Sequence, residues 1–341
     1  MLTTAERLFS NDWDAIRRII EDGNRFLLTT HVMADPDALG SELALAEGLR
    51  CIGKNPVLIN PTPVGANVQF LDSSHEVQVF HAGLDCSTFD AVFILDISRW
   101  ERLGALSDPI RLCGKPKICI DHHPYTGGYA DHHLVNTNAC ASAEIVYDLL
   151  NYMAIPINER IAECLYASIL ADTGSFSFSN TNARSHKIAA ELLNKGVPHR
   201  QIHEKLFQNH GAKRLQFMGK VLSGLQFDCD QKLAWMTISH DFLQENGMTF
   251  EEAEGFVDMP RNCRSVLLSI MFLEVEPGDI KISLRAKGDF NCNQLATIFG
   301  GGGHNHASGI RMLGTMQEVE HLVLTEARKA LQPFLNLTQS I

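Results

Sequence analysis

Acidic and histidine side chains gather at four places in the first half of the chain. Carboxylates and imidazoles bind divalent metal ions, and a carboxylate beside a histidine also orients the imidazole ring. A turn or a helix cap explains one such group, but four groups in one domain favour a metal centre. The groups are His31 with Asp35 and Asp37, then Asp96, then Asp121-His122-His123, and finally Asp172.

Each group also has a simpler structural explanation. Asp35 or Asp37 can cap the helix predicted after them, although capping uses one acid and leaves His31 unexplained. Asp96 taken alone is most often a turn residue. Asp172 ends a predicted helix, where the helix dipole disfavours a carboxylate unless a cation compensates, and the competing role is to cap the next turn. These explanations account for single residues and not for the set.

The set supplies six metal ligands, more than one octahedral ion needs when water and substrate also bind. Two ions that share one bridging carboxylate would use all six. The donors are rich in oxygen and lack thiolate, which favours Mn²⁺ or Mg²⁺ over structural zinc, and the two histidines favour Mn²⁺. Two ions about 3.5–4 Å apart can generate a hydroxide nucleophile and hold the attacking and leaving oxygens of a phosphate. The expected ligands are His31, Asp35, Asp37, Asp96, His122 and Asp172.

A second copy of the tripeptide, Asp131-His132-His133, follows the first. No apolar run precedes the second copy, whereas the first directly follows a predicted strand. We therefore expect the second copy to lie in a loop or at a pocket rim, and we assign the metal site to the first.

A run of four glycines stands out in the second half of the chain. Gly300 to Gly303 follow a predicted helix and exceed what a helix C-cap requires. Their backbone N–H groups can form an anion nest, with a second helix beginning just after, and His304 would then meet a phosphate. A flexible linker is the alternative. His306 is an additional histidine to which the sequence assigns no role.

Arg285 ends a predicted strand shortly before the glycine run. Arginine binds phosphate through a two-pronged guanidinium group. A solvated charge on an edge strand explains this residue equally well from local sequence alone, so both interpretations stay open.

The elements that must position these residues alternate between strand and helix in the first half. Short, uniformly apolar runs fit buried parallel strands with helices as crossovers, and ligands gather at the carboxyl ends of such strands. His31, Asp96 and Asp121 lie at the ends of these runs. The predicted strands are residues 26–30, 56–60, 91–95 and 117–120, and the predicted helices are 41–49, 142–152 and 160–171.

The pattern changes in the second half. Residues 184–217 read as a helical connector, and the domain boundary is expected between residues 190 and 215. A turn at Pro277, Gly278 and Asp279 predicts a hairpin. The strands predicted after the connector are 222–227, 233–239, 266–275 and 280–285, followed by a helix over 293–299.

Bulk properties limit the class of protein. A chain of 341 residues fits two domains better than one core. The net charge of −11 argues against tight binding to long nucleic acid, and no apolar stretch is long enough to span a membrane. Nine cysteines, an odd number without a CxxC pair, favour a reducing compartment and hence a cytoplasmic location.

Together these motifs resemble the DHH phosphoesterase family. The resemblance covers nearly the whole chain, from about residue 10 to residue 330, and its combined motifs are specific. The chain is most similar to the branch of short oligoribonucleases (nanoRNases) that also act on 3′-phosphoadenosine-5′-phosphate. The matching motifs are His31-x-x-x-Asp35-Pro36-Asp37, Asp96, Asp121-His122-His123 and Asp172, with Ser283-Leu284-Arg285 and Gly300-Gly301-Gly302-Gly303-His304 resembling the DHH-associated C-terminal domain.

The resemblance implies an α/β fold of two domains with the active site in the cleft between them. Residues 1–190 would form a parallel-sheet, metal-binding catalytic domain, and residues 191–215 a helical linker. Residues 216–341 would form a smaller, mixed-sheet α/β domain that binds substrate.

The resemblance also implies a role for each site residue. Asp96 would bridge two Mn²⁺ ions, with Mg²⁺ as the other candidate, while His123 would contact the phosphate and Asp121 would orient the histidines. One ion would be held by His31, Asp35 and Asp96, and the other by Asp37, Asp96, His122 and Asp172. Substrate would be bound by Arg285, Gly301, Gly302, Gly303 and His304.

The implied activity is two-metal hydrolysis of phosphoester bonds. The substrates would be short RNA or DNA oligonucleotides, which release 5′-mononucleotides, and 3′-phosphoadenosine-5′-phosphate, which yields AMP. No membrane and no long nucleic acid would be bound, and a homodimer is left open. The alternatives are a phosphodiesterase for cyclic or linear dinucleotides such as pApA or pGpG, and a non-catalytic nucleotide-binding protein on the same fold.

Overall fold

Short apolar runs in the first half of the chain form the strands of a parallel sheet, as the sequence predicts. The computed structural model describes residues 12–97, 99–124, 128 and 130–335. Strand neighbours in the first sheet follow the order β3-β2-β1-β4-β5-β6, and every pairing is parallel. The strands are β1 (Arg25–Thr29), β2 (Asn55–Asn60), β3 (Gln78–Val79), β4 (Ala91–Leu95), β5 (Lys117–Asp121) and β6 (His132–Val135).

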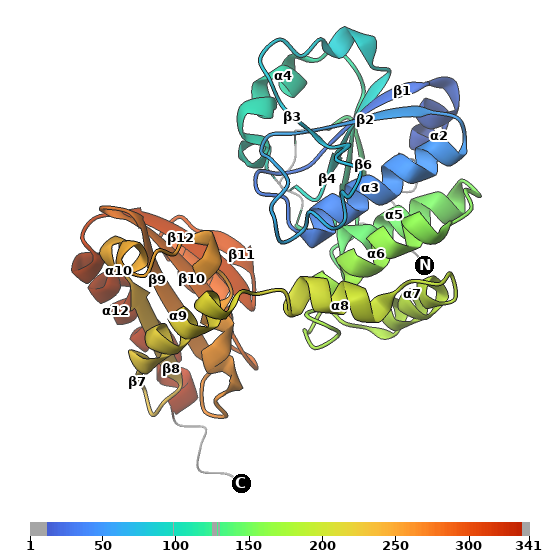
Figure 1. Cartoon of the computed structure of the whole chain (residues 1–341). Helices are drawn as coiled ribbons and strands as arrows, with labels where there is room; N and C mark the ends of the chain where they lie inside the picture. The colour runs from blue at the N-terminus through green and yellow to red at the C-terminus, as the bar shows by residue number, and fades with distance from the viewer. Residues whose placement is uncertain (1–11, 98, 125–127, 129, 336–341) are drawn as a thin grey trace. The chain divides into compact units, whose positions relative to one another are not determined.

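Helices cover both faces of this sheet (Figure 1). Phe26 and Leu28 point into the larger core, whereas Leu27 between them points into the core on the opposite face, as alternation along a strand requires. The helices that contribute to the larger core are α2 (Asp12–Asp22), α3 (Pro36–Cys51), α5 (Ser142–Tyr152), α6 (Glu159–Asp172), α7 (Ala183–Leu193) and α8 (His199–Phe207). The opposite face is covered by η2 (Trp100–Leu106) and α4 (Ser107–Leu112), with the short turn η1 (Cys86–Thr88) nearby.

A close approach of α3 to α6 fixes the two helix ends that carry predicted ligands. A Cβ at Gly40 would lie 2.7 Å from the Cys164 carbonyl oxygen, so only glycine fits there. Ser168 on α6 donates a hydrogen bond to the Pro36 carbonyl at 3.1 Å. The start of α3 and the end of α6 are therefore held against each other.

The sequence predicted that the second copy of the tripeptide lies in a loop or at a pocket rim, and the structure differs. His132 and His133 belong to β6, and they pair in register with Ile118 and Cys119 of β5. β6 is the last strand of the sheet, where polar side chains are tolerated, and Asp12 Oδ2 accepts a hydrogen bond from the His133 backbone N–H at 3.1 Å. The absence of an apolar run was thus a poor guide at the edge of the sheet.

The second half of the chain forms a mixed sheet, also as expected. Strand neighbours follow the order β11-β12-β10-β9-β8-β7, with β8 and β9 parallel and the other pairs antiparallel. β9 and β10 form the predicted hairpin. The strands are β7 (Gln226–Asp228), β8 (Leu233–Ile238), β9 (Leu268–Glu276), β10 (Asp279–Ala286), β11 (Gly302–His304) and β12 (Ala307–Leu313).

Helices cover both faces of this second sheet as well (Figure 1). One face packs against α11 (Cys292–Ile298) and α12 (Met316–Leu335), and the other against α9 (Ala212–Ser223) and α10 (His240–Glu245) with the turns η3 (Glu251–Ala253) and η4 (Phe256–Asn262). The strand predicted over 222–227 is wrong at its start, because α9 continues to Ser223 through the buried residues Phe217 and Val221.

The chain divides into two compact units, Met1–Asn209 and His210–Ile341. The region read as a helical connector contains α7, α8 and the first half of α9. Among the described residues, no helix is both long and apolar enough to cross a membrane.

Candidate metal centre

The start of α3 brings two predicted ligands to one point. Asp35 is the N-cap residue, and its Oδ1 accepts hydrogen bonds from the backbone N–H groups of Asp37 and Ala38, both at 3.0 Å. Pro36 occupies the first helical turn, where its missing N–H costs nothing. The capping explanation is right for Asp35, yet its Oδ2 lies 3.8 Å from His31 Nε2. One carboxylate therefore caps the helix and also faces the histidine.

His31 follows β1 in a fixed orientation. Its Nδ1 lies 2.8 Å from the Val32 carbonyl oxygen, which requires this nitrogen to donate. In the neutral ring Nε2 then carries a lone pair, the form in which histidine binds metals. Nε2 is buried, faces Asp96 Oδ2 at 3.4 Å, and makes no hydrogen bond within the described part of the chain.

Asp96 lies at the centre of the group. It follows β4 in the left-handed conformation (φ 55°), which aspartate adopts more readily than most residues, and it is only 2% exposed. Its Oδ1 accepts a hydrogen bond from Ser142 Oγ at 2.9 Å and lies 3.7 Å from His122 Nε2. A simple turn residue would not be buried among histidines, so the turn explanation does not account for Asp96.

The N-terminus of α5 holds Asp37. The backbone N–H groups of Ser142 and Ala143 donate to its two oxygens at 2.7 and 3.1 Å, and Ser41 Oγ donates at 3.1 Å. The positive end of a helix dipole favours a carboxylate in this place. Sequence reasoning missed Ser142 and Ala143, because nothing in the sequence shows that this helix start faces the site.

His122 lies close to three carboxylates, those of Asp37, Asp96 and Asp172. Its Nε2 lies 3.8 Å from Asp37 Oδ2, 3.7 Å from Asp96 Oδ1 and 3.8 Å from Asp172 Oδ2. Asp172 is the last residue of α6, and its Oδ2 accepts a hydrogen bond from Asn180 Nδ2 at 3.1 Å. Asn180 was not predicted, and no sequence signal points to it.

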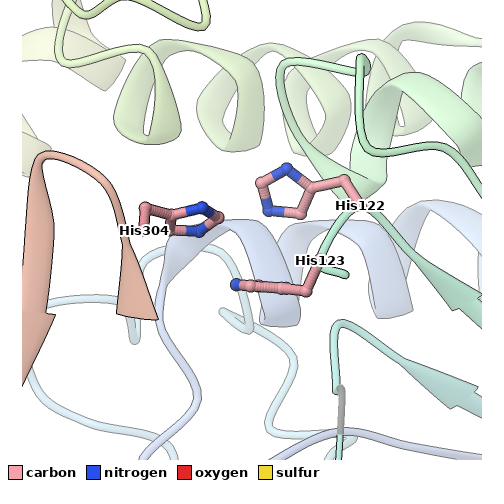
Figure 2. A group of neighbouring side chains, drawn as sticks. All are labelled: His122, His123 and His304. Atoms are coloured by element: carbon pink, nitrogen blue, oxygen red, sulfur yellow. The ribbon is translucent and has the colours of Figure 1, made fainter. Parts of the chain in front are cut away.

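His123 takes a different position from its neighbour. Asp121 Oδ1 accepts from its backbone N–H at 3.1 Å and lies 2.8 Å from its Nδ1. The rings of His122 and His123, drawn in Figure 2, meet edge to face with centroids 4.5 Å apart. Asp121 therefore contacts His123, and the role that the resemblance implies for it, to orient the histidines, stays a prediction.

The donor set fits a divalent-metal site. Ligand atoms that each lie about 2.1–2.2 Å from a shared ion are about 3–3.5 Å apart, close to the 3.4–3.8 Å spacings found here and longer than strong hydrogen bonds. The buried, unbonded His31 Nε2 is what a missing ion would leave behind. Within the first unit, three groups of described residues place their ligand atoms within 4.8 Å of one another, and all three contain Asp96: His31-Asp35-Asp96, Asp37-Asp96-His122 and Asp96-Asp121-His123.

The electrostatics also call for a cation. Burial and the nearby charge of Asp96 raise the pKa of Asp37 to about 7. Burial, with Asp37 and Asp96 close by, raises the pKa of Asp172 well above its ordinary value. Burial would likewise raise the pKa of Asp96, but His31, His123 and His122 outweigh burial and lower it. Without metal, these carboxylates cannot all be charged at little cost.

Burial and nearby carboxylates have opposing effects on the pKa values of the histidines. Burial alone would lower the pKa of His31, His122 and His123, but the surrounding carboxylates raise each of these pKa values. A bound cation would offset this effect at the proposed ligands His31 and His122 and favour their neutral, ligating rings.

Arg285 and the glycine run lie in the second unit. Arg285 is on β10, between β9 and β12, so it is not an edge-strand charge. Its Nε lies 3.3 Å from Asp258 Oδ1, which also accepts from Arg261 at 2.8 Å. His304, drawn in Figure 2, ends β11. The substrate-binding roles of Arg285 and His304 stay predictions.

The glycine run has a structural explanation that the sequence did not reveal. Gly300 takes a left-handed conformation after α11 (φ 74°), as a residue that ends a helix often does. A Cβ at Gly303 would lie 2.5 Å from the Ala307 carbonyl oxygen, and one at Gly301 would lie 2.9 Å from Ile310. The second helix expected just after the run is wrong, because β11 and β12 form a tight hairpin there.

The structure thus brings the six predicted ligands and the pair Asp121 and His123 to one place in the first unit. The second copy of the tripeptide is used differently, since Asp131 Oδ2 accepts from the Lys117 backbone N–H at 2.8 Å at the start of β6. That the six residues bind metal stays a prediction.

Comparisons with known proteins give a consistent picture. The DHH family, N-terminal domain, matches residues 25–169, and the DHHA1 domain matches residues 230–333. The bifunctional oligoribonuclease and PAP phosphatase NrnA of Bacillus subtilis is 30% identical over 86% of this chain and 90% of its own length. The protein of the same name from Thermus thermophilus is 28% identical over 94% and 95%.

A solved structure is similar as well. The crystal structure of an exopolyphosphatase-related protein from Bacteroides fragilis is 28% identical, with a TM-score of 0.87 over 95% of this chain and 97% of that one. The chain therefore spans nearly the full length of each of these relatives.

Proposed function

This chain belongs to the DHH family and carries a DHHA1 domain, and from that premise we propose that it hydrolyses phosphoester bonds in short oligoribonucleotides and in 3′-phosphoadenosine-5′-phosphate. Relatives that carry both activities in their names match nearly the whole chain, which supports this substrate class. The products would be 5′-mononucleotides from the oligonucleotides and AMP from the nucleotide.

One observation carries the proposal. Side chains from the loop after β1, the start of α3 and the end of β5 surround the buried carboxylate of Asp96, and their spacing fits shared metal ions better than hydrogen bonds. A non-catalytic relative on the same fold would have no reason to keep this set complete.

The ligand assignment follows two of the three groups that contain Asp96, with Asp172 added to the second through His122. His31, Asp35 and Asp96 would hold one ion, and Asp37, Asp96, His122 and Asp172 the other, with Mn²⁺ preferred over Mg²⁺. When bound, the ions would supply charge neutralisation for the phosphate and a water-derived nucleophile near neutral pH.

The chain's own groups then bind and orient the substrate. Asp121 accepts a hydrogen bond from His123 Nδ1, and the carboxylates of Asp121 and Asp96 raise the pKa of His123, so a doubly protonated His123 ring would contact a phosphate oxygen. In the second unit, Arg285 would exchange its contact with Asp258 for a phosphate, and His304 with the N–H groups of Gly301, Gly302 and Gly303 would bind the same substrate. We also infer a reducing location such as the cytoplasm, because all nine cysteines are free.

The test is an assay of product release across substrates of increasing length. Dinucleotide, trinucleotide, pentanucleotide and decanucleotide RNA are compared with 3′-phosphoadenosine-5′-phosphate, each with Mn²⁺, with Mg²⁺ and with chelator. We expect metal-dependent release of mononucleotide from the shortest substrates, with rates that fall as length increases. No turnover of the dinucleotide or of 3′-phosphoadenosine-5′-phosphate with either metal would refute the proposal, and a preference for a cyclic dinucleotide would favour that substrate class instead.

A further inference from the structure

The second unit contains a cavity of about 670 Å³ that the proposed catalytic role does not use. This volume lies within the range typical of small-molecule sites. The cavity lies between the segment before α11, α11 itself, the tip of the β11–β12 hairpin and the second half of α12, and His306, to which the sequence assigned no role, lines it.

Backbone contacts fix the walls of this cavity. The Cys292 N–H donates to the Asn305 carbonyl oxygen at 2.8 Å, and His306 Nε2 lies 3.0 Å from the Gly288 carbonyl oxygen. Asn291 caps α11 through its Oδ1, which accepts from Gln294 N–H at 3.3 Å. The hairpin tip and the start of α11 are thus tied together, and the site is formed in advance.

The floor of the cavity is apolar and partly aromatic. Phe290 and Phe334 meet with ring centroids 5.5 Å apart, and Leu295 is buried beside them. Ile298 is 60% exposed at the margin, although a large apolar side chain gains from being covered. A flat, apolar face of a ligand would cover these residues.

The rim of the cavity is lined by amide side chains. The amides of Gln294 and Asn305 make no hydrogen bond to the described residues, and the Nδ2 of Asn291 also has none. Among the residues that the structure describes, no lysine or arginine lines the cavity and Asp289 is its one carboxylate, so the cavity does not suit a phosphate. Amides offer a donor and an acceptor together, the pattern that pairs with the N6 and N7 edge of adenine.

We propose that this cavity binds a nucleobase of the substrate, with adenine preferred. The inference rests on the proposed function, and it adds a base preference to it. Asn305, which lines the cavity, directly follows His304 on the same hairpin, so the cavity lies beside the residue to which the proposed function assigns the phosphate.

The experiment compares Gln294→Leu and Asn305→Leu, singly and together, with Gln317→Leu as the matched control. Gln317 is exposed in the first turn of α12 and does not line the cavity. Two readouts are used: AMP and UMP binding to the metal-free full chain by calorimetry, and kcat and KM for adenine and uracil dinucleotides with Mn²⁺. Thermal melting of each variant checks that it is folded.

In the wild-type chain, AMP should bind more tightly than UMP. The double variant should raise KM for the adenine dinucleotide about tenfold with kcat unchanged, leave the uracil dinucleotide unaffected, and weaken AMP binding to a similar degree. The control should match the wild type. An adenine-to-uracil ratio that is the same in the wild type and both single variants would overturn the proposal.

The two readouts separate this inference from the proposed function. If no substrate is hydrolysed, loss of AMP binding in the variants still supports the cavity as a base site. If AMP binding is lost but the KM for the adenine dinucleotide does not change, the occupant is a separate nucleotide, and the assignment to a substrate base is wrong.

Discussion

Replacing Asp96 by asparagine tests the whole metal centre with one atom exchange. The carboxylate faces His31 Nε2 at 3.4 Å, His122 Nε2 at 3.7 Å and His123 Nδ1 at 3.5 Å. Asparagine keeps the volume and can still accept from Ser142 Oγ, but it carries no charge and its amide nitrogen cannot bind a metal ion. Both proposed ions would lose a ligand at once.

The expected effect on activity is large. Removal of one preorganised transition-state contact typically costs 10²–10³-fold in kcat. Since Asp96 serves both ion groups, we expect a loss of at least about 10³-fold, which corresponds to about 4 kcal/mol in the activation barrier.

The expected effect on folding is small. In the metal-free chain, removal of the Asp96 charge relieves its repulsion with Asp37 but also loses its attraction to the three histidines that lower its pKa, and these two effects oppose each other. We expect the Asp96→Asn chain without metal to lose less than about 1 kcal/mol of stability. Lost turnover would then reflect the site and not the fold.

Two quantities are measured for each variant: the rate of dinucleotide turnover, and the melting temperature as Mn²⁺ is titrated. A ligand at 100 times its Kd stabilises by about 2.7 kcal/mol, or about 5–10 °C for a unit of this size. The wild type should show this shift, and Asp96→Asn should lose most of it. Asp131→Asn, in the second copy of the tripeptide, is the control and should keep both the shift and the turnover. If Asp96→Asn retains the wild-type shift and rate, the convergence on Asp96 has been misinterpreted.

Three further predictions concern residues around the site. Ser142→Ala removes the hydroxyl that donates to the buried Asp96 but keeps the Ser142 backbone N–H that donates to Asp37. We expect kcat to fall about tenfold in steady-state kinetics. Burial raises the pKa of Glu42 to about 8, so its contribution to stability is fully present below about pH 4.5 and is lost as pH rises through 8. In Glu42→Gln, the free energy of unfolding should therefore decline less with pH, by up to about 5 kcal/mol, in urea unfolding from pH 5 to 9. The same decline in the wild type and the variant would contradict this prediction. Gly303→Ala places a Cβ against the Ala307 carbonyl oxygen, so we expect a loss of about 1–3 kcal/mol in denaturant unfolding, and a loss near zero would show that the hairpin can shift.

The sequence predicted the parallel sheet and the gathering of its ligands because these follow from strong local signals. Each strand of the sheet interior is a short apolar run, and β4 and α5 have the predicted bounds. Chemistry at the carboxyl end of such strands is a general rule of open sheets, so His31, Asp96 and Asp121 could be expected to meet. By contrast, the residues that hydrogen-bond to each carboxylate come from distant segments, and no local sequence pattern predicts which segments meet.

The parts that sequence reasoning missed depend on contacts between distant segments. Ser142 donates to Asp96 from 46 residues away, and Asn180 reaches Asp172 only because a loop folds back. The glycine run suggested an anion nest, but Gly301 and Gly303 are needed because β12 passes so close. A glycine that makes room for a ligand and one that makes room for a neighbouring strand look the same in sequence.

The double use of Asp35 has a consequence for how ions are exchanged. Oδ1 secures the first turn of α3 through two backbone N–H groups, and a cation bound at Oδ2 would not require these contacts to break. Emptying the site therefore need not unravel the helix that presents it. One metal ion should therefore replace another while α3 stays folded. The rate of exchange should be set by dehydration of the incoming ion and not by refolding of the helix.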